Sequence, residues 1–226
     1  MTPQCGFLYS LSLRNARARA ALVLSEDDWN CFARDCVVVF LYPLGEGISP
    51  SVLSPRVAAW VSSCTGVMSA PHDWLGRVLG PCDAGELEAV RDAVSRFLCV
   101  TELRNAVLPL NSGRPPKWSP FPHHANIYCC SPKAAPPGKM YAVLPDDDWN
   151  GSMDYTVTAR LTSQAKDARA RWESQVRGGC IVVGDLVQVE ISEFSPTPPR
   201  PPRPSSLQAK EKMALGAGIA QLLVLP

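Results

Sequence analysis

The feature that most constrains the fold is a short segment that occurs twice. Ala20 to Leu41 reads AALVLSEDDWNCFARDCVVVFL, Tyr141 to Leu161 reads YAVLPDDDWNGSMDYTVTARL, and the shared Asp-Asp-Trp-Asn begins 120 residues apart. Each copy has an apolar run before the acidic residues, a β-branched or alternating run after the asparagine, and an upstream tyrosine, Tyr9 or Tyr128. This pattern predicts two related β units. A chance match of one short segment is the competing explanation.

Charge and length set broad limits on function. The 226 residues are 46% hydrophobic, which is enough for one large core or two small ones. Lysine and arginine number 22 against 21 acidic residues, so no overall field attracts nucleic acid or an anionic membrane. We therefore expect no nucleic-acid partner unless a local patch exists.

Cysteine usage and the absence of leader segments suggest an intracellular protein. The nine cysteines are an odd number without framework spacing, which favours buried reduced thiols in a cytoplasmic or nuclear protein. No signal peptide is predicted. The apolar stretch 213–226 has 14 residues, too few to cross a bilayer, so no membrane partner is expected.

The spacing of apolar residues and the positions of glycine and proline predict an α+β protein. Its two related β-rich units, barrel-like or sandwich-like, carry surface amphipathic helices and end in a proline-rich tether. Strands are predicted over 6–13, 21–24, 36–42, 126–129, 140–144, 154–161 and 180–192, and helices over 54–64, 83–98 and 163–177. The predicted domains are 1–107, a proline-rich linker over 108–122, a second unit over 123–194, and a tether with an apolar end over 195–226.

Several residue groups invite a chemical role. The acidic triplets 26–28 and 146–148 fit either a hydrated magnesium ion or a solvated turn, and the solvated turn is preferred. The arginines within 14–20 fit either phosphate contacts or an ordinary solvated face, and the solvated face is preferred. The three histidines and the cysteines lack zinc-finger spacing and fall in loop-like contexts, so neither a zinc site nor a nucleophile–histidine pair is predicted. No P-loop or GxGxxG is present.

A proline-rich segment fits a peptide-docking motif. Residues 198–203 read PPRPPR and match PxxPxR, in which a polyproline II helix docks on an aromatic groove. The partner-binding candidates are Pro198, Pro201 and Arg203. They make an interaction adaptor, using a ligand of the SH3 type, one alternative function.

The end of the chain resembles a family. LGAGIAQLLVLP over 215–226 resembles the fourth motif of dUTPases, the strand reading close to G-x-x-I-A-Q-L, and 142–159 and 179–191 are similar in outline to the first and third motifs. The resemblance implies a nucleotide site with Asp154, Tyr155, Gly179, Ile181 and Gln221 as substrate-binding residues and Asp185 as the catalytic candidate. It implies magnesium only if the enzyme is active; no other cofactor is expected.

Departures from the family pattern decide between a non-catalytic and an active member of the family. Val182 stands where the third motif has its aspartate, and the second and fifth motifs have no counterpart. The leading interpretation is therefore a degenerate dUTPase-like protein, of viral or retroelement origin, that acts as a non-catalytic binding or regulatory factor in nucleotide metabolism. An active dUTP nucleotidohydrolase is the alternative within the family. A helix over 206–225 is the competing interpretation of the tail, and it would remove the family argument.

Overall fold

A computed structural model describes residues 2–13, 17–46, 49–105, 122–130, 139–162, 173–176, 179–194 and 205–225. The chain forms two compact units. Unit 1 comprises Met1–Phe97 with Gly184–Leu186 and Ala220–Pro226, and unit 2 comprises Leu98–Val183 with Val187–Ile219. Most of the predicted linker and the proline-rich segment 195–204 lie outside the described residues, so the predicted domain boundaries remain predictions.

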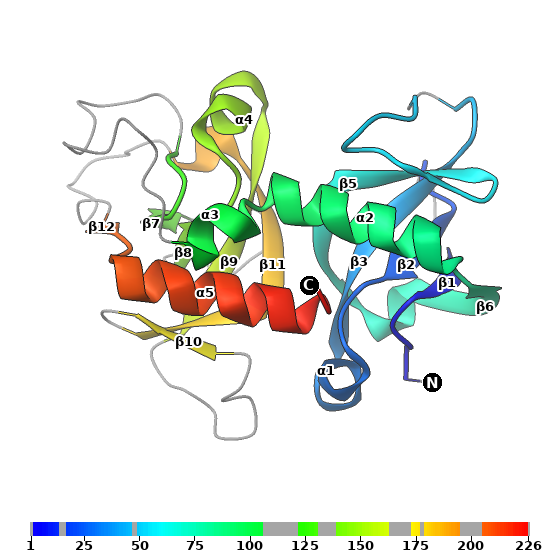
Figure 1. The fold of residues 1–226 in the computed structure, drawn as a ribbon, viewed down its shortest axis with the longest axis horizontal. Coiled ribbons are helices and arrows are strands. Elements are labelled where there is room, and N and C mark those ends of the chain that lie inside the picture. Colours follow the sequence, from blue (N-terminus) through cyan, green and yellow to red (C-terminus); the bar gives the residue numbers. More distant parts are fainter. Residues whose placement is uncertain are drawn as a thin grey trace. The chain divides into compact units, whose positions relative to one another are not determined.

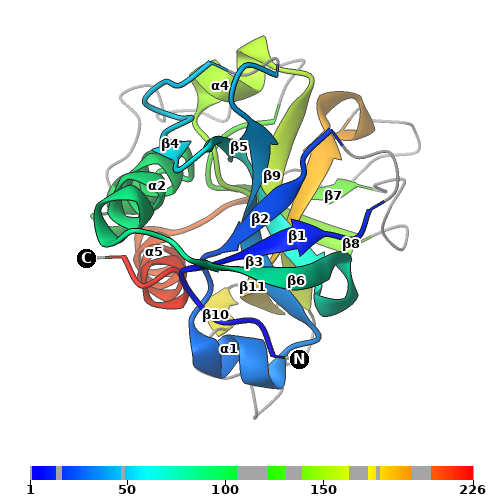
Figure 2. The same ribbon diagram turned by 90° about the vertical axis from the view of Figure 1, so that its right-hand side faces the viewer.

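Unit 1 is built on a six-stranded sheet with the strand order β4-β5-β3-β2-β1-β6, in which all neighbours are antiparallel (Figures 1 and 2). Its elements, in chain order, are β1 (Phe7–Leu11), β2 (Ala20–Val23), α1 (Asp27–Phe32), β3 (Asp35–Pro43), β4 (Arg56–Val57), β5 (Trp60–Pro71), the 3-10 turn η1 (His72–Trp74), β6 (Leu75–Pro81) and α2 (Ala84–Phe97).

The core of unit 1 follows from its residue types. The β3 run CVVVFLY is apolar on both faces, and Cys36 to Val39 are fully buried, as expected for a central strand. Asp83 caps α2 by accepting the Gly85 N–H at 2.8 Å. The helix then turns one face, with Val90, Val94 and Phe97, toward β4 and β5. Figure 2 shows β6, β1, β2 and β3 side by side.

Unit 2 repeats this plan. Its elements are α3 (Val100–Arg104), β7 (Asn126–Cys130), β8 (Lys139–Val143), α4 (Asp147–Ser152), β9 (Tyr155–Thr162), β10 (Glu173–Val176), β11 (Gly179–Glu190), the 3-10 turn η3 (Ile191–Phe194) and β12 (Ser205–Ser206), after which α5 (Ala209–Leu222) follows. The strand order is β10-β11-β9-β8-β7-β12, which matches the sheet of unit 1 position by position. The predicted β-rich α+β class and the predicted repeat are both confirmed.

The correspondence extends to individual hydrogen bonds. The buried Asn30 and Asn150 each donate from Nδ2 to a backbone carbonyl, of Ser25 or Pro145, at 3.0 Å in both units. Four backbone N–H donors in each unit also have matching partners. Gly6 and Ala125 donate to Val23 O and Val143 O (2.8 and 2.9 Å), and Leu24 and Leu144 donate to Val37 O and Val157 O (2.8 and 3.1 Å). Cys82 and Leu207 donate to Gly6 O and Ala125 O (2.8 and 3.0 Å), and Gln4 and His123 donate to the hydroxyls of Tyr9 and Tyr128 (2.9 Å each).

Three predicted elements are wrong or only partly described. The predicted helix 54–64 is a β-hairpin, because Ala58 takes a positive φ of 51° and turns β4 back onto β5. Its apolar spacing fits an alternating strand as well as a helix. Of the predicted helix 163–177, residues 173–176 form strand β10 instead, and residues 163–172 lie outside the described part.

The C-terminal segment predicted as a strand by the dUTPase resemblance is the helix α5. Leu215, Ile219 and Leu222 recur at helical spacing and are fully buried. The two glycines serve close approach: a Cβ at Gly216 would lie 2.7 Å from the Arg104 backbone nitrogen on α3. None of the described helices is both long and apolar enough to span a membrane.

Candidate functional site

Three exposed arginines of unit 1 lie on or beside the neighbouring strands β1, β2 and β6. Arg17 and Arg19 lie in the connection between β1 and β2, and Arg77 lies on the edge strand β6, which pairs with β1. We call these three residues the arginine strip. Among the described residues, no carboxylate forms an ion pair with them. Other arginines of unit 1 are engaged, such as Arg96, which pairs with Asp92 at 2.7 Å.

The backbone beneath the strip is fixed by hydrogen bonds. Arg19 donates its N–H to Leu41 O at 3.0 Å and accepts the Leu11 N–H at 3.1 Å, so it extends the sheet between β1 and β3. Ser12 donates its N–H to Trp74 O at 2.9 Å, which fastens the end of β1 to the residue just before β6. The guanidinium of Arg19 therefore projects from an ordered position.

Two serine hydroxyls lie between β1 and β6. Tyr9 and Leu11 face the core of unit 1, so Ser10 and Ser12 point to the opposite face of β1. Gly76 on β6 leaves room for them, because a Cβ there would lie 2.7 Å from Ser10 Oγ and 3.0 Å from Ser12 Oγ. Arg19 lies opposite Leu11 across β1 and β2, so it belongs to the face of Tyr9 and Ala21, and the two serines lie on the other face of the sheet.

The segments that form these strands contain arginines and no acidic residues. Residues 2–25 contain three arginines and no aspartate or glutamate, and residues 75–82 contain Arg77 and no acid. Acids border these segments, because Glu26 follows the first and Asp73 and Asp83 stand on either side of the second. A chain of net charge +1 thus carries the local basic patch that phosphate binding requires.

This arrangement is suited to binding and offers no acid–base chemistry of its own. Guanidinium groups are donors that phosphate oxygens prefer. No histidine, aspartate or glutamate occurs within 2–25 or 75–82 that would move a proton there. The signal was present in the sequence as an acid-free stretch around the arginines, whereas Arg77 joins it only through the β1–β6 pairing.

The acidic triplets have structural roles in the described residues. Asp27 Oδ1 accepts the Cys5 N–H at 2.6 Å, and Asp147 Oδ1 accepts the His124 N–H at 2.7 Å. Asp146 caps α4 by accepting the Trp149 N–H at 2.7 Å. Three or more potential metal ligands do not gather anywhere among the residues that the structure describes.

The residues assigned through the dUTPase resemblance do not form one site. Asp154 and Tyr155 lie at the start of β9, in a shallow groove with Glu190 and Ile191. Gly179 begins β11, roughly 35 Å along that strand from the groove. Ile181 is fully buried in the core, Asp185 is half-buried in β11, and Gln221 is exposed on α5. Pro198, Pro201 and Arg203 lie outside the described residues.

Comparisons with known proteins give weak likenesses. No family model and no curated protein matches the sequence. Among solved structures, an endoribonuclease from a mycobacterial species in complex with its cognate antitoxin is 19% identical, with a TM-score of 0.33, 42% of this chain covered and 90% of that one. MazE-MazF from Deinococcus radiodurans is 15% identical with a TM-score of 0.37, and the match covers 47% of this chain and 99% of that one. The Mycobacterium tuberculosis toxin MazF-mt6 is 19% identical with a TM-score of 0.31, and the match covers 39% of this chain and 92% of that one.

The dUTPase interpretation is wrong. The segment that carried the resemblance is the helix α5. The family's fourth motif requires a strand there. The degenerate viral dUTPase-like factor, the active dUTP nucleotidohydrolase and the role in nucleotide metabolism all fall with that segment. The adaptor alternative depended on residues outside the described part of the chain.

Proposed function

We propose that unit 1 binds a nucleic-acid strand through its phosphates, without reading base sequence. The observation that supports this most is Arg19, an exposed arginine held by two backbone hydrogen bonds in an acid-free part of the sheet. Arg17 and Arg77 extend the positive charge on either side of it.

The charge count sets the expected salt dependence. Three arginine–phosphate contacts on a single strand release about two counterions, because the logarithm of affinity falls with slope of about −0.7 per contact. Binding should therefore be tight only at low ionic strength. A ligand held mainly by stacking or base hydrogen bonds would show a shallower slope.

The first prediction concerns Arg19→Ala. Removing this guanidinium should weaken binding roughly five- to tenfold at ~0.1 M salt and reduce the salt slope by about 0.7, because one charge-assisted contact is lost. Fluorescence anisotropy with a labelled 20-nucleotide RNA, measured between about 50 and 200 mM salt, gives both quantities. DNA strands of the same sequence, single and double, show which form of nucleic acid fits the strip.

Arg96→Ala is the matched control. It removes an exposed arginine from the same unit and changes the net charge equally, but Arg96 lies on α2 and pairs with Asp92. We expect it to leave both affinity and slope unchanged. Equal losses in the two variants would mean that only overall charge matters, and no binding by the parent chain at 50 mM salt would reject the proposed function.

A further inference from the structure

A groove of about 680 Å³ lies on unit 2, between the residues that lead into β9 and those that follow from β11. One wall consists of Met153, Asp154 and Tyr155, and the other of Glu190, Ile191 and Ser192. The Ile191 N–H donates to Asp154 O at 2.8 Å and joins the two walls. The groove is therefore framed by hydrogen-bonded backbone.

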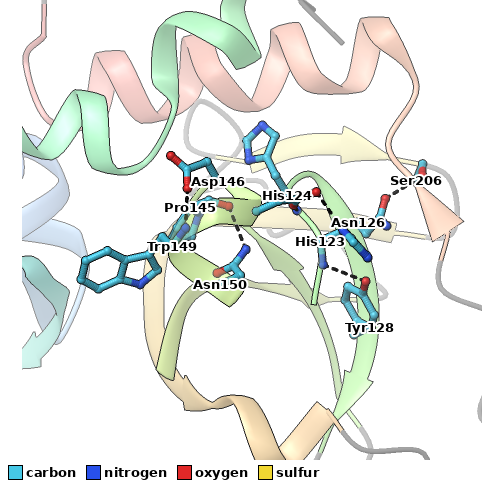
Figure 3. A network of polar contacts seen from close by, with 10 residues as sticks. His123, His124, Asn126, Tyr128, Pro145, Asp146, Trp149, Asn150 and Ser206 are labelled. Carbon is cyan, nitrogen blue, oxygen red and sulfur yellow. Dashed lines mark hydrogen bonds and ion pairs between the residues drawn. The ribbon is translucent and has the colours of Figure 1, made fainter. Parts of the chain in front are cut away.

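The first wall is also held by α4, which directly precedes it. The Trp149 N–H donates to Asp146 Oδ1 at 2.7 Å, and Asn150 Nδ2 donates to Pro145 O at 3.0 Å (Figure 3). The indole of Trp149 packs edge-on against the Tyr155 ring, with 6.1 Å between the ring centroids and 75° between their planes. Tyr155 thus lines the groove as an aromatic ring whose position is supported by α4.

The lining combines apolar and acidic side chains. Met153 is 36% exposed, and Tyr155 and Ile191 are half-buried, so the groove offers apolar surface to a ligand. Asp154 and Glu190 are exposed carboxylates, one on each wall. A long side chain with an apolar stem and a cationic end has the matching character.

The segments that supply the two walls contain acids and neither lysine nor arginine. Residues 140–156 include four acidic residues, and residues 179–194 include three. A polyanion such as nucleic acid is repelled by this charge, whereas a cation is attracted. An arginine within a peptide fits better than free arginine, because the α-carboxylate of the free amino acid would meet no positive partner from these segments.

The matching junction of unit 1 has a different character. There the His72 N–H donates to Arg34 O at 3.0 Å, which is the equivalent of the bond between Ile191 and Asp154. Arginine thus stands in unit 1 where unit 2 has an aspartate. The acidic lining is therefore a property of unit 2 and is not required by the backbone that the units share.

We infer that the groove binds an arginine side chain presented by a peptide segment of a partner protein. The aliphatic stem of the arginine lies along Met153 and Ile191. Its guanidinium lies beside the Tyr155 ring, where it meets the carboxylates of Asp154 and Glu190. A planar guanidinium stacks on aromatic rings and bonds to carboxylates with a fork of donors, which the ammonium of lysine does less well. This inference concerns unit 2 and is independent of nucleic-acid binding by unit 1.

NMR titration of the isotope-labelled full chain with acetyl-Gly-Arg-Gly-amide tests this. The backbone amides of residues 153–155 and 190–192 should shift on binding. The same peptide with lysine in place of arginine should bind about two- to fivefold more weakly, because it loses the stacked, forked contact. A peptide with citrulline, which has a similar shape and no charge, should not shift these amides, and free arginine should bind more weakly than the arginine peptide.

Variants of the two carboxylates test the charge contacts. Asp154→Asn and Glu190→Gln should each weaken binding of the arginine peptide about two- to fivefold, since each removes one exposed ion pair. Asp73→Asn is the matched control, because it removes an exposed carboxylate beside the equivalent junction of unit 1 and changes the net charge equally. We expect it to leave the affinity unchanged.

Several results would overturn the inference. An absence of shifts at residues 153–155 and 190–192 would show that the groove does not take the peptide. Equal affinity for the arginine and lysine peptides would show attraction to positive charge alone, and equal or tighter binding of free arginine would show a small-molecule site. These comparisons use the parent chain, so they decide the question even where a variant does not fold.

Discussion

At the scale of single residues, buried polar groups explain why two distant segments share Asp-Asp-Trp-Asn. Asn150 is almost fully buried, donates to Pro145 O at 3.0 Å and accepts the Thr156 hydroxyl at 2.6 Å. Asn30 makes the same pair of bonds within unit 1, to the carbonyl and the hydroxyl of Ser25. An apolar residue would leave these groups unpaired in the core, so asparagine persists where the surrounding sequence has changed.

Asn150→Ala should destabilise unit 2 by about 2–4 kcal/mol, because it leaves a buried carbonyl and a buried hydroxyl without their partner. Urea unfolding, followed by far-ultraviolet circular dichroism, measures the change. Thr156→Val is the control, since it removes one hydroxyl and leaves the Asn150 bond to Pro145 intact. A loss in Asn150→Ala no larger than in Thr156→Val would show that the carbonyl contact has little weight.

At the scale of elements, the spacing of apolar residues predicted the structure wherever it fits only a helix or only a strand. The β3 run and the capped α2 helix were predicted correctly for this reason. The prediction was wrong at 54–64, because the spacing of the buried residues Val57, Val61 and Cys64 fits both a helix and a hairpin. The positive φ of Ala58 decides for the hairpin, and alanine carries no sequence signal for it.

Helix α5 shows a second kind of failure, because the family resemblance implied a strand over these residues. Gly216→Ala should destabilise unit 2 by about 1–3 kcal/mol, since the new Cβ would lie 2.7 Å from the Arg104 nitrogen and 2.8 Å from Leu103 Cβ on α3. Thermal unfolding measures this. Gly218→Ala is the graded control, with its closest contact at 3.0 Å from Val183 Cγ1. A more stable Gly216→Ala variant would mean that α5 moves freely away from α3.

At the scale of the whole molecule, overall charge concealed the candidate site. The balance of 22 basic and 21 acidic residues predicts no polyanion partner, yet the arginine strip lies in a part of unit 1 without acids. Charge counted in windows finds Arg17 and Arg19. It does not find Arg77, because only the β1–β6 pairing brings β6 beside β1. Long-range strand pairing is the information that the sequence does not display.

The thiols report on the two units separately. The seven cysteines whose environment is described form no disulfide, and burial raises the pKa of Cys36, Cys64 and Cys99 to about 12. At pH 8 only ~10⁻⁴ of each would be thiolate, so iodoacetamide should label exposed Cys31 first. With rising urea, Cys36 and Cys64 should become reactive as unit 1 unfolds, and Cys99 as unit 2 unfolds. Labelling of Cys36 at the rate of Cys31 in native buffer would contradict this burial.

The matched hydrogen bonds of the two units also show which residues are compatible with the same backbone position. At some paired positions, such as Gly6 with Ala125 or Cys82 with Leu207, two different residues make the same backbone hydrogen bond. Transplanting a residue from one repeat to its counterpart therefore begins from a geometry known to fit. Chimaeras assembled in this way would separate the features that hold the frame from those that distinguish one half in its task.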